Sequence, residues 1–274
     1  MNKTKAAIGA SLMGAFALGA IVVAFSSAQE QSTTSQAPKA SITTSFSGLE
    51  EEEIGDIIRA YLMENPEVII EAVNAYSRRE QLAAESRASD GAKANLAALV
   101  NPENGFIAGK NPSRAKVTVI EMYDYHCTFC KRATGIIKEI ADKDADVKVV
   151  FRELPILKEE SNYAAEASLA AREQGKFLDF HFAMMKAKGT LTKQRVHEIA
   201  KKQGIDVAKL ERTAGARRTS DAIIETHEIA REMGVDGTPA FIVATTDGSY
   251  VEVVTGFRPD ELRERIAEAK KAAK

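Results

Sequence analysis

The sequence of 274 residues is long enough for one sizeable domain with an accessory segment. A net charge of −2, with lysines and glutamates mixed along the chain rather than grouped by sign, argues against a nucleic-acid partner. The hydrophobic fraction of 45% and the charged fraction of 28% are typical of a soluble protein with a packed core.

The N-terminus has the pattern of an export signal. A short basic stretch, Met1 to Lys5, precedes an uncharged apolar run from Ala6 to Phe25, and Ser26-Ser27-Ala28 follows. This pattern predicts that residues 1–28 are a signal peptide cleaved after Ala28. A run of about 20 apolar residues is also long enough to span a bilayer, so a retained membrane anchor stays open. Both alternatives predict a periplasmic or other extracytoplasmic location.

The next two segments differ in composition. Residues 29–48 are rich in Ser, Thr, Gln and Ala, which predicts a flexible linker. Residues 49–103 carry apolar residues at helical spacing, on both sides of Asn65-Pro66-Glu67, where Asn65 is expected to cap a second helix. The sequence shows no nearby strand to bury this stripe. We therefore expect 49–103 to be a helical oligomerisation stalk that holds a dimer or trimer. The stripe comprises Ile54, Ile57, Ile58, Leu62, Val68, Ile69 and Val73.

The sequence pattern of residues 104–274 predicts an α/β domain. Apolar, β-branched runs at 116–125 and 147–154 indicate strands, with a helix between them. Residues from about 158 to 233 read as helices broken by glycines, a helical insertion. Two further strands, 238–244 and 250–255, are separated by the turn Asp247-Gly248, and a final helix begins near Pro259. The order is β-α-β, a helical insertion, then β-β-α.

The chain contains two cysteines, Cys127 and Cys130, at the predicted strand-to-helix turn. The unpaired N–H groups of a helix N-terminus favour a thiolate, which is the form that attacks disulfides. Cys127 is therefore the expected nucleophile and Cys130 the buried resolving thiol. A structural zinc site is disfavoured, because His126 is the only further ligand near the two cysteines. A purely structural disulfide is also disfavoured, because it would close too small a loop to stabilise the fold much. We predict no metal and no cofactor.

The segment from Tyr123 to Arg132, which reads Tyr-Asp-Tyr-His-Cys-Thr-Phe-Cys-Lys-Arg, resembles the active site of the DsbA-like branch of the thioredoxin superfamily. The order of elements resembles that branch as well. The segment Gly234 to Phe241 resembles the family's cis-proline loop. This likeness covers about residues 104–274 and implies a thioredoxin fold with an inserted helical domain. Residues 49–80 resemble the N-terminal segment of ScsC-type proteins, which are associated with copper tolerance.

The resemblance implies roles for three residues away from the cysteines. Pro239 would be the cis-proline beside the active-site sulfurs, although an ordinary trans-proline is the alternative. Thr238 would line a groove for an extended substrate. Glu121, six residues before Cys127, would help move the proton of the buried thiol. Because strand faces alternate, a surface-facing Glu121 remains the alternative.

The residues around the cysteines bear on the type of reaction. His126, Thr128 and Phe129 are expected to contact substrate, and His126 could also support the thiolate if its ring faces the sulfur. Strongly oxidising members of the family carry Pro-His between the cysteines. Phe129 cannot donate a hydrogen bond to the thiolate, which favours an isomerase or reductase. A monomeric oxidase and a Cu(I)-binding protein are the alternatives. The expected partners are exported proteins that contain cysteines and a membrane thiol redox partner.

Overall fold

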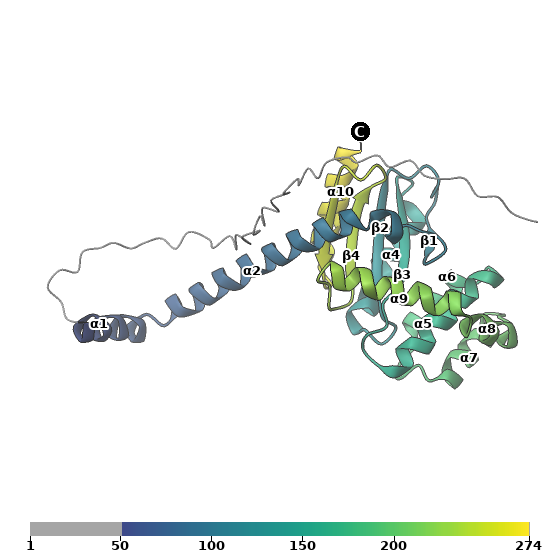
Figure 1. Ribbon diagram of the computed structural model, residues 1–274, viewed down its shortest axis with the longest axis horizontal. Helices are drawn as coiled ribbons and strands as arrows, with labels where there is room; N and C mark the ends of the chain where they lie inside the picture. The colour runs from purple at the N-terminus through teal and green to yellow at the C-terminus, as the bar shows by residue number, and fades with distance from the viewer. Residues whose placement is uncertain (1–50, 274) are drawn as a thin grey trace, which may run out of the picture. The chain divides into compact units, whose positions relative to one another are not determined.

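The computed structural model describes residues 51–273 (Figure 1). The predictions for residues 1–28 and 29–48 lie outside this range. Within this range, residues 60–273 form one compact unit, and residues 51–59 belong to a separate one. In the described range, no helix combines the length and the apolar character needed to cross a membrane.

One sheet lies at the centre of the described chain, with the strand order β1-β3-β2-β4-β5. β2 and β3 are parallel and joined by α4 (Thr128–Lys143), whereas the other neighbouring pairs are antiparallel. The predicted α/β fold, with its β-α-β and β-β-α parts, is therefore confirmed. The short β1 was not predicted. The strands are β1 (Phe106–Ala108), β2 (Val117–Tyr123), β3 (Val147–Glu153), β4 (Ala240–Thr245) and β5 (Val251–Thr255).

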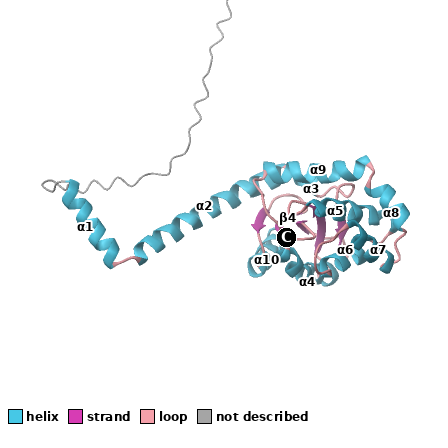
Figure 2. Cartoon of the chain, turned by 90° about the horizontal axis from the view of Figure 1, so that it is seen from below, coloured by secondary structure: helices cyan, strands magenta, loops and turns pink. Residues whose placement is uncertain are grey.

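Helices cover both faces of the sheet. Figure 2 shows α4 and α10 (Pro259–Ala272) on one side of the strands, with α9 (Arg217–Glu232) on the other. Two apolar clusters correspond to these two interfaces. All seven residues of β2 are buried, which explains its continuous apolar run.

The helical insertion occupies the chain between β3 and β4 and ends with α9. Its other helices are α5 (Glu159–Ala171), the short 3₁₀ helix η1 (Arg172–Gln174), α6 (Phe177–Lys186), α7 (Lys193–Lys202) and α8 (Val207–Ala214). The fully buried Arg152 on β3 fastens α9 to the sheet. Its guanidinium donates to Thr226 Oγ1 at 3.1 Å and to Glu225 Oε1 at 3.0 Å. A buried arginine needs such partners, because desolvating an unpaired charge is costly.

The segment before the sheet is helical, as expected. It contains α1 (Glu51–Glu64), α2 (Glu67–Ala94) and α3 (Leu96–Leu99). Asn65 does not cap α2, contrary to expectation: Pro66 takes the cap position without a side-chain hydrogen bond. The Asn65 amide instead donates to the carbonyl of Tyr61 at 2.9 Å and so closes α1.

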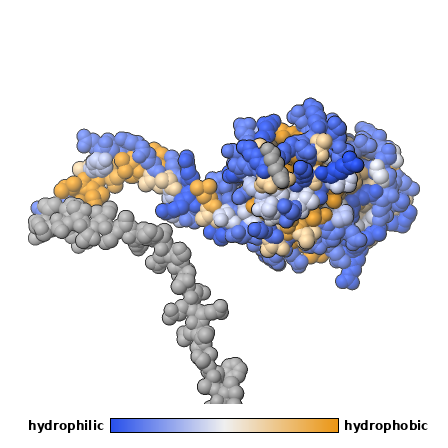
Figure 3. Space-filling model, turned by 90° about the horizontal axis from the view of Figure 1, so that it is seen from above, coloured by the Kyte–Doolittle hydropathy of each residue, from blue (hydrophilic) through white to orange (hydrophobic). Residues whose placement is uncertain are grey.

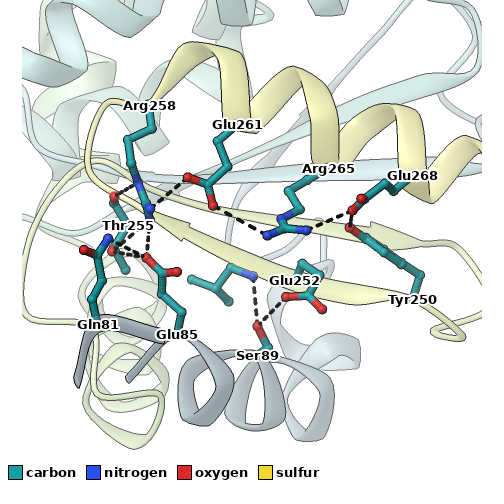
Figure 4. Close-up of polar contacts among 11 residues, drawn as sticks. Gln81, Glu85, Ser89, Tyr250, Glu252, Thr255, Arg258, Glu261, Arg265 and Glu268 are labelled. Atoms are coloured by element: carbon teal, nitrogen blue, oxygen red, sulfur yellow. Dashed lines mark hydrogen bonds and ion pairs between the residues drawn. The ribbon is translucent and has the colours of Figure 1, made fainter. Parts of the chain in front are cut away.

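The two halves of α2 have different environments. In the C-terminal half, Ala88 and Ala92 are buried in the cluster that includes residues of β4 and β5. Ser89 Oγ accepts a hydrogen bond of 3.0 Å from the backbone N–H of Val253, on the edge strand β5. Glu85 forms an ion pair with Arg258, just beyond β5 (Figure 4). The predicted segment 49–103 is thus divided near Glu85, and its later part packs with the sheet.

This packing predicts different effects for two substitutions on α2. Ala92→Asp places a carboxylate at a site with no solvent exposure and should lower the free energy of unfolding by about 3 kcal/mol or more. Ala84→Asp is the matched control, because Ala84 is exposed on the same helix and carries the same cost in helix propensity. Urea denaturation of both variants would measure the difference. Equal losses would show that the later half of α2 does not contribute to the core.

Candidate active site

Cys127 is the N-cap residue of α4. Its Sγ accepts a hydrogen bond from the backbone N–H of Cys130 at 3.3 Å and donates one to the carbonyl of Thr238 at 3.1 Å. Cys127 keeps 4% of its surface exposed, whereas Cys130 has none, and both are free thiols. Cys127 is therefore the only one of the two cysteines with any solvent exposure.

The two sulfurs titrate in opposite directions. The pKa of Cys127 is lowered to about 6, chiefly by a hydrogen bond with the Cys130 thiol. Thr238 and the backbone N–H groups of Cys130 and Phe129 add to this effect, while burial opposes it. The pKa of Cys130 is raised, first by burial, then by its hydrogen bond to Cys127 and by the negative charges of Glu121 and Cys127. Near neutral pH, Cys127 is a thiolate and Cys130 a thiol.

The loop Thr238-Pro239 lies against Cys127, although more than 100 residues separate them in sequence. The peptide bond between Thr238 and Pro239 is cis. The Pro239 carbonyl accepts a hydrogen bond of 2.8 Å from the backbone N–H of Gly256, just after β5. The Thr238 hydroxyl is buried and has no hydrogen-bond partner within the described residues. Thr238 therefore contacts the sulfur, and Pro239 follows it directly in the sequence, while the contact of both residues with substrate stays a prediction.

Glu121 faces inward from β2 and is 1% exposed. One carboxyl oxygen, Oε1, has no hydrogen-bond partner within the described residues. Burial raises the pKa of Glu121 to about 8, and the charge of Cys127 adds to the shift. The surface-facing alternative for this residue does not hold. A buried carboxyl that interacts with both sulfurs is suited to exchanging a proton with Cys130.

Asp124, which the sequence analysis did not single out, holds the turn before the motif in place. Its carboxylate is 1% exposed and accepts hydrogen bonds from the backbone N–H of His126 at 2.7 Å and from the hydroxyl of Ser161 at 2.9 Å. The N–H groups of Ile156 and Leu157 also donate to it, both at 2.9 Å. The one available signal was its position, directly after a buried strand and three residues before Cys127.

His126 is tied into the same network. Its Nε2 accepts a hydrogen bond from the N–H of Leu191 at 2.9 Å, so Nδ1 carries the proton and donates to Ser161 Oγ at 2.8 Å. Burial lowers the pKa of His126, which keeps the ring neutral. With both ring nitrogens engaged and the side chain 4% exposed, the imidazole has no hydrogen bond to offer Cys127. Its contact with substrate remains a prediction.

Thr128 and Phe129 are exposed on the first turn of α4, beside the reactive sulfur. The Phe129 side chain is 52% exposed, and the guanidinium carbon of Arg132 lies 5.3 Å from the centre of its ring. Neither feature supplies a side-chain hydrogen bond to Cys127. Phe129 therefore presents an apolar surface to whatever approaches the sulfur.

A buried polar network joins the motif to the helical insertion. The Tyr125 hydroxyl lies 2.9 Å from Nδ1 of His181 and 2.6 Å from Ser168 Oγ. Tyr123 donates to Glu153 Oε1 at 2.5 Å. Burial lowers the pKa of His181 to about 3, so the ring stays neutral. The network fixes the insertion against the strand that leads into Cys127.

The fold and the dithiol geometry define a thioredoxin-type oxidoreductase. The profile of the DSBA-like thioredoxin domain matches residues 118–267, more than half of the chain, and the chain belongs to this family. A second profile, the copper resistance protein ScsC N-terminal domain, matches residues 50–83. The resemblances noted in the sequence are confirmed.

Solved structures agree with this assignment. The chain is 37% identical to a thioredoxin-like oxidoreductase from Silicibacter pomeroyi, with a TM-score of 0.56 over 61% of this chain and 93% of that one. It is 26% identical to Salmonella enterica Typhimurium BcfH, with a TM-score of 0.64 over 80% and 95%. It is 25% identical to the thiol-disulfide exchange protein α-DsbA2 from Wolbachia pipientis, with a TM-score of 0.59 over 68% and 97%.

The chain spans about a quarter of the length of the curated relatives that it matches. The Na(+)/H(+) antiporter NhaA 1 of Salinispora arenicola is 29% identical over 181 residues, which make up 62% of this chain and 28% of the relative. The likeness is thus to one part of a longer protein.

The lowered pKa of Cys127 predicts how its alkylation depends on pH. In the reduced protein, the rate of reaction of Cys127 with iodoacetamide should rise through a midpoint near pH 6 and then level off. Cys130→Ala should move this midpoint upward, because the Cys130 thiol makes the largest contribution to the lowered pKa. Mass spectrometry of the labelled peptides would follow both cysteines. Faster labelling of Cys130, or a midpoint above pH 8 in the unaltered chain, contradicts the assignment.

Proposed function

We propose that this chain exchanges disulfides in exported proteins and works as an isomerase or reductase. The observation that carries the proposal is the pairing of Cys127, which is slightly exposed and has a pKa of about 6, with a fully buried Cys130 whose pKa is raised. A ready nucleophile beside a protonated resolving thiol is what disulfide exchange requires.

The reaction balances as two exchanges. The Cys127 thiolate attacks one sulfur of a substrate disulfide, the substrate S–S bond breaks, and the departing sulfur leaves as a thiolate that takes a proton from water. Cys130 then loses its proton to Glu121 and attacks Cys127, which releases the second substrate sulfur. Two electrons pass to the substrate, and the enzyme ends as a disulfide. In isomerisation a substrate thiolate attacks the mixed disulfide instead, which restores the enzyme dithiol.

The exposed Phe129 supports the isomerase or reductase direction over the oxidase direction. A side-chain donor at this position would stabilise the thiolate and so the reduced enzyme, which makes a disulfide more oxidising. Phe129 offers none. A reductase needs a supply of electrons, which a membrane thiol redox partner would provide. The N-terminal sequence pattern supports an extracytoplasmic site of action.

The early part of the helical segment supports assembly into a dimer or trimer. Large apolar side chains are exposed along α2, among them Ile69, Ile70, Val73 and Tyr76, each more than half exposed. Figure 3 shows hydrophobic surface on these N-terminal helices. Apolar side chains gathered on one helix face gain stability when a second chain covers them. Joined catalytic domains would hold a substrate while its disulfides are exchanged.

Removal of the resolving thiol should trap the reaction halfway. Cys130→Ala should accumulate mixed disulfides between Cys127 and a scrambled-disulfide substrate, visible as a higher-mass band on non-reducing gels. Cys127→Ala should abolish both the adduct and disulfide exchange. An adduct formed by Cys127→Ala, but not by Cys130→Ala, would reverse the two roles.

The stalk prediction can be tested without truncating the core. At 100° per residue, Ile69, Val73 and Tyr76 share one face of α2, and Glu71, Asn74 and Arg78 lie on or towards the other. Replacing Ile69, Val73 and Tyr76 with serine should convert a dimer or trimer into a monomer, because each of these side chains contributes roughly 1.5–3 kcal/mol to association when it is buried. The monomer should still reduce small disulfides but lose isomerase activity. Light scattering would report the mass.

Serine at Glu71, Asn74 and Arg78 is the matched control and should leave the mass unchanged. Assembly through α2 would be refuted if the unaltered chain were a monomer. It would also be refuted if the variant with serine at Ile69, Val73 and Tyr76 remained a dimer or trimer.

A further inference from the structure

A pocket of about 500 Å³ opens beside the Cys-x-x-Cys motif. Both sequence neighbours of Cys127, His126 and Thr128, line it, so the pocket begins one residue from the reactive sulfur. Its walls come from α4, from the residue before α5, and from α6 with the loop that follows it. The pocket is therefore placed to hold a part of the substrate that lies close to the disulfide under attack.

The lining of the pocket is positively charged. No described residue that lines the pocket carries a carboxylate. Four of the lining residues are lysines, namely Lys131, Lys158, Lys186 and Lys188. The described residues contain no ion pair for any of the four. Lys131 Nζ donates to the carbonyl of Ala187 at 2.6 Å, and Lys158 Nζ donates to Thr190 Oγ1 at 3.2 Å. These acceptors are neutral, so neither hydrogen bond removes positive charge from the pocket.

The neighbouring acids offset only part of this charge. Asp124, whose carboxylate accepts hydrogen bonds from surrounding N–H and hydroxyl groups, acts on Lys131 but forms no ion pair with it within the described residues. Glu160, in the first turn of α5, acts on His126 together with Asp124. Glu159 precedes it and does not line the pocket. Burial lowers the pKa of Lys131 more than the negative charge of Asp124 raises it.

A cationic pocket beside an anionic nucleophile changes which disulfides react well. The Cys127 thiolate repels a disulfide that carries negative charge near its sulfurs. The ammonium groups of the pocket offset this repulsion and attract the carboxylate. We infer that the lysine-lined pocket binds a carboxylate carried next to the substrate's disulfide, which makes acidic disulfides preferred substrates. This inference rests on the proposed exchange activity and specifies the substrate class of that site.

Two sources could supply this chemistry: an acidic residue beside a cysteine in a polypeptide, or a small acidic disulfide such as glutathione disulfide. The experiment uses the reduced chain and two peptide disulfides that differ only in having Glu or Gln on each side of the cysteine. A parallel arm compares glutathione disulfide with its esterified, carboxyl-blocked form. Second-order rate constants are measured at low and high ionic strength.

We expect the Glu peptide to react about 3- to 30-fold faster than the Gln peptide at low salt, with the advantage shrinking at high salt. The variant Lys186→Gln/Lys188→Gln should bring the ratio close to one. Preference for the carboxyl form in only one arm identifies the source. Lys131 and Lys158 are left in place, because their hydrogen bonds also hold neighbouring segments.

The matched control is Lys143→Gln/Lys271→Gln, which removes the same charge. Lys143 ends α4, at the opposite end from the motif, and Lys271 lies near the end of α10, which contacts that region through Lys270 and Asp144. This control should keep the preference. Equal rates for charged and neutral disulfides in both arms, or a ratio unaffected by the pocket variant, overturn the inference. An equal loss of the preference for the Glu peptide in the control variant also overturns the inference, because the loss would then reflect net charge alone.

A separate measurement keeps the pocket and the activity apart. Peptides with S-methylated cysteine cannot exchange, so their binding, followed by NMR titration, reports on the pocket alone. Tighter binding of the Glu form that is lost in Lys186→Gln/Lys188→Gln would support the pocket even if no disulfide reacted, in which case the proposed function fails. Equal binding of the Glu and Gln forms would count against the pocket even if exchange were fast.

Discussion

The hydrogen bonds to Cys127 Sγ at the start of α4 are the interaction on which the site depends. A helix N-terminus leaves backbone N–H groups without partners, and here the sulfur supplies an acceptor. Cys127 can occupy this position because its φ of −72° and ψ of 116° are extended, while the next residue is helical. The N–H of Cys127 in turn donates to the Asp124 carbonyl at 3.0 Å. The same contacts that cap the helix stabilise the thiolate, so folding and reactivity share one geometry.

Glu121 places an opposing demand on this arrangement. Burial raises the pKa of Glu121 to about 8, and repulsion between its carboxylate and the Cys127 thiolate adds to the shift. In the proposed mechanism the thiolate charge disappears when Cys127 enters a mixed disulfide. The repulsion from Cys127 is then lost, so the pKa of Glu121 falls, while burial continues to raise it. An ionised Glu121 beside Cys130 can accept the thiol proton at the step that needs it.

Local sequence patterns predicted the elements that have strong periodicity and could not predict contacts made across the fold. β2, β3 and α4 stood out because their apolar runs or spacing are long, whereas β1 has only three residues. The direction of Glu121 was ambiguous because alternation gives no guidance in a strand buried on both faces. The pocket lysines come from separate segments, and only the folded chain shows that they share one cavity. The packing of Ala88 and Ala92 was hidden because an alanine-rich helix also suits solvent.

The docked half of α2 is connected to the active-site loop through a short series of contacts. Arg258 forms an ion pair with Glu85 of α2, and its Nε donates a hydrogen bond to the carbonyl of Thr255 at 3.0 Å (Figure 4). The next residue, Gly256, adopts the left-handed φ of 77° that favours glycine, and its N–H donates to the Pro239 carbonyl. Thr238, directly before Pro239, accepts the hydrogen bond from Cys127. The turn at residues 255–258, which contacts α2, thus also supports the Thr238-Pro239 loop. Because these contacts share one turn, the later half of α2 is part of the scaffold that positions the active site rather than a separate appendage.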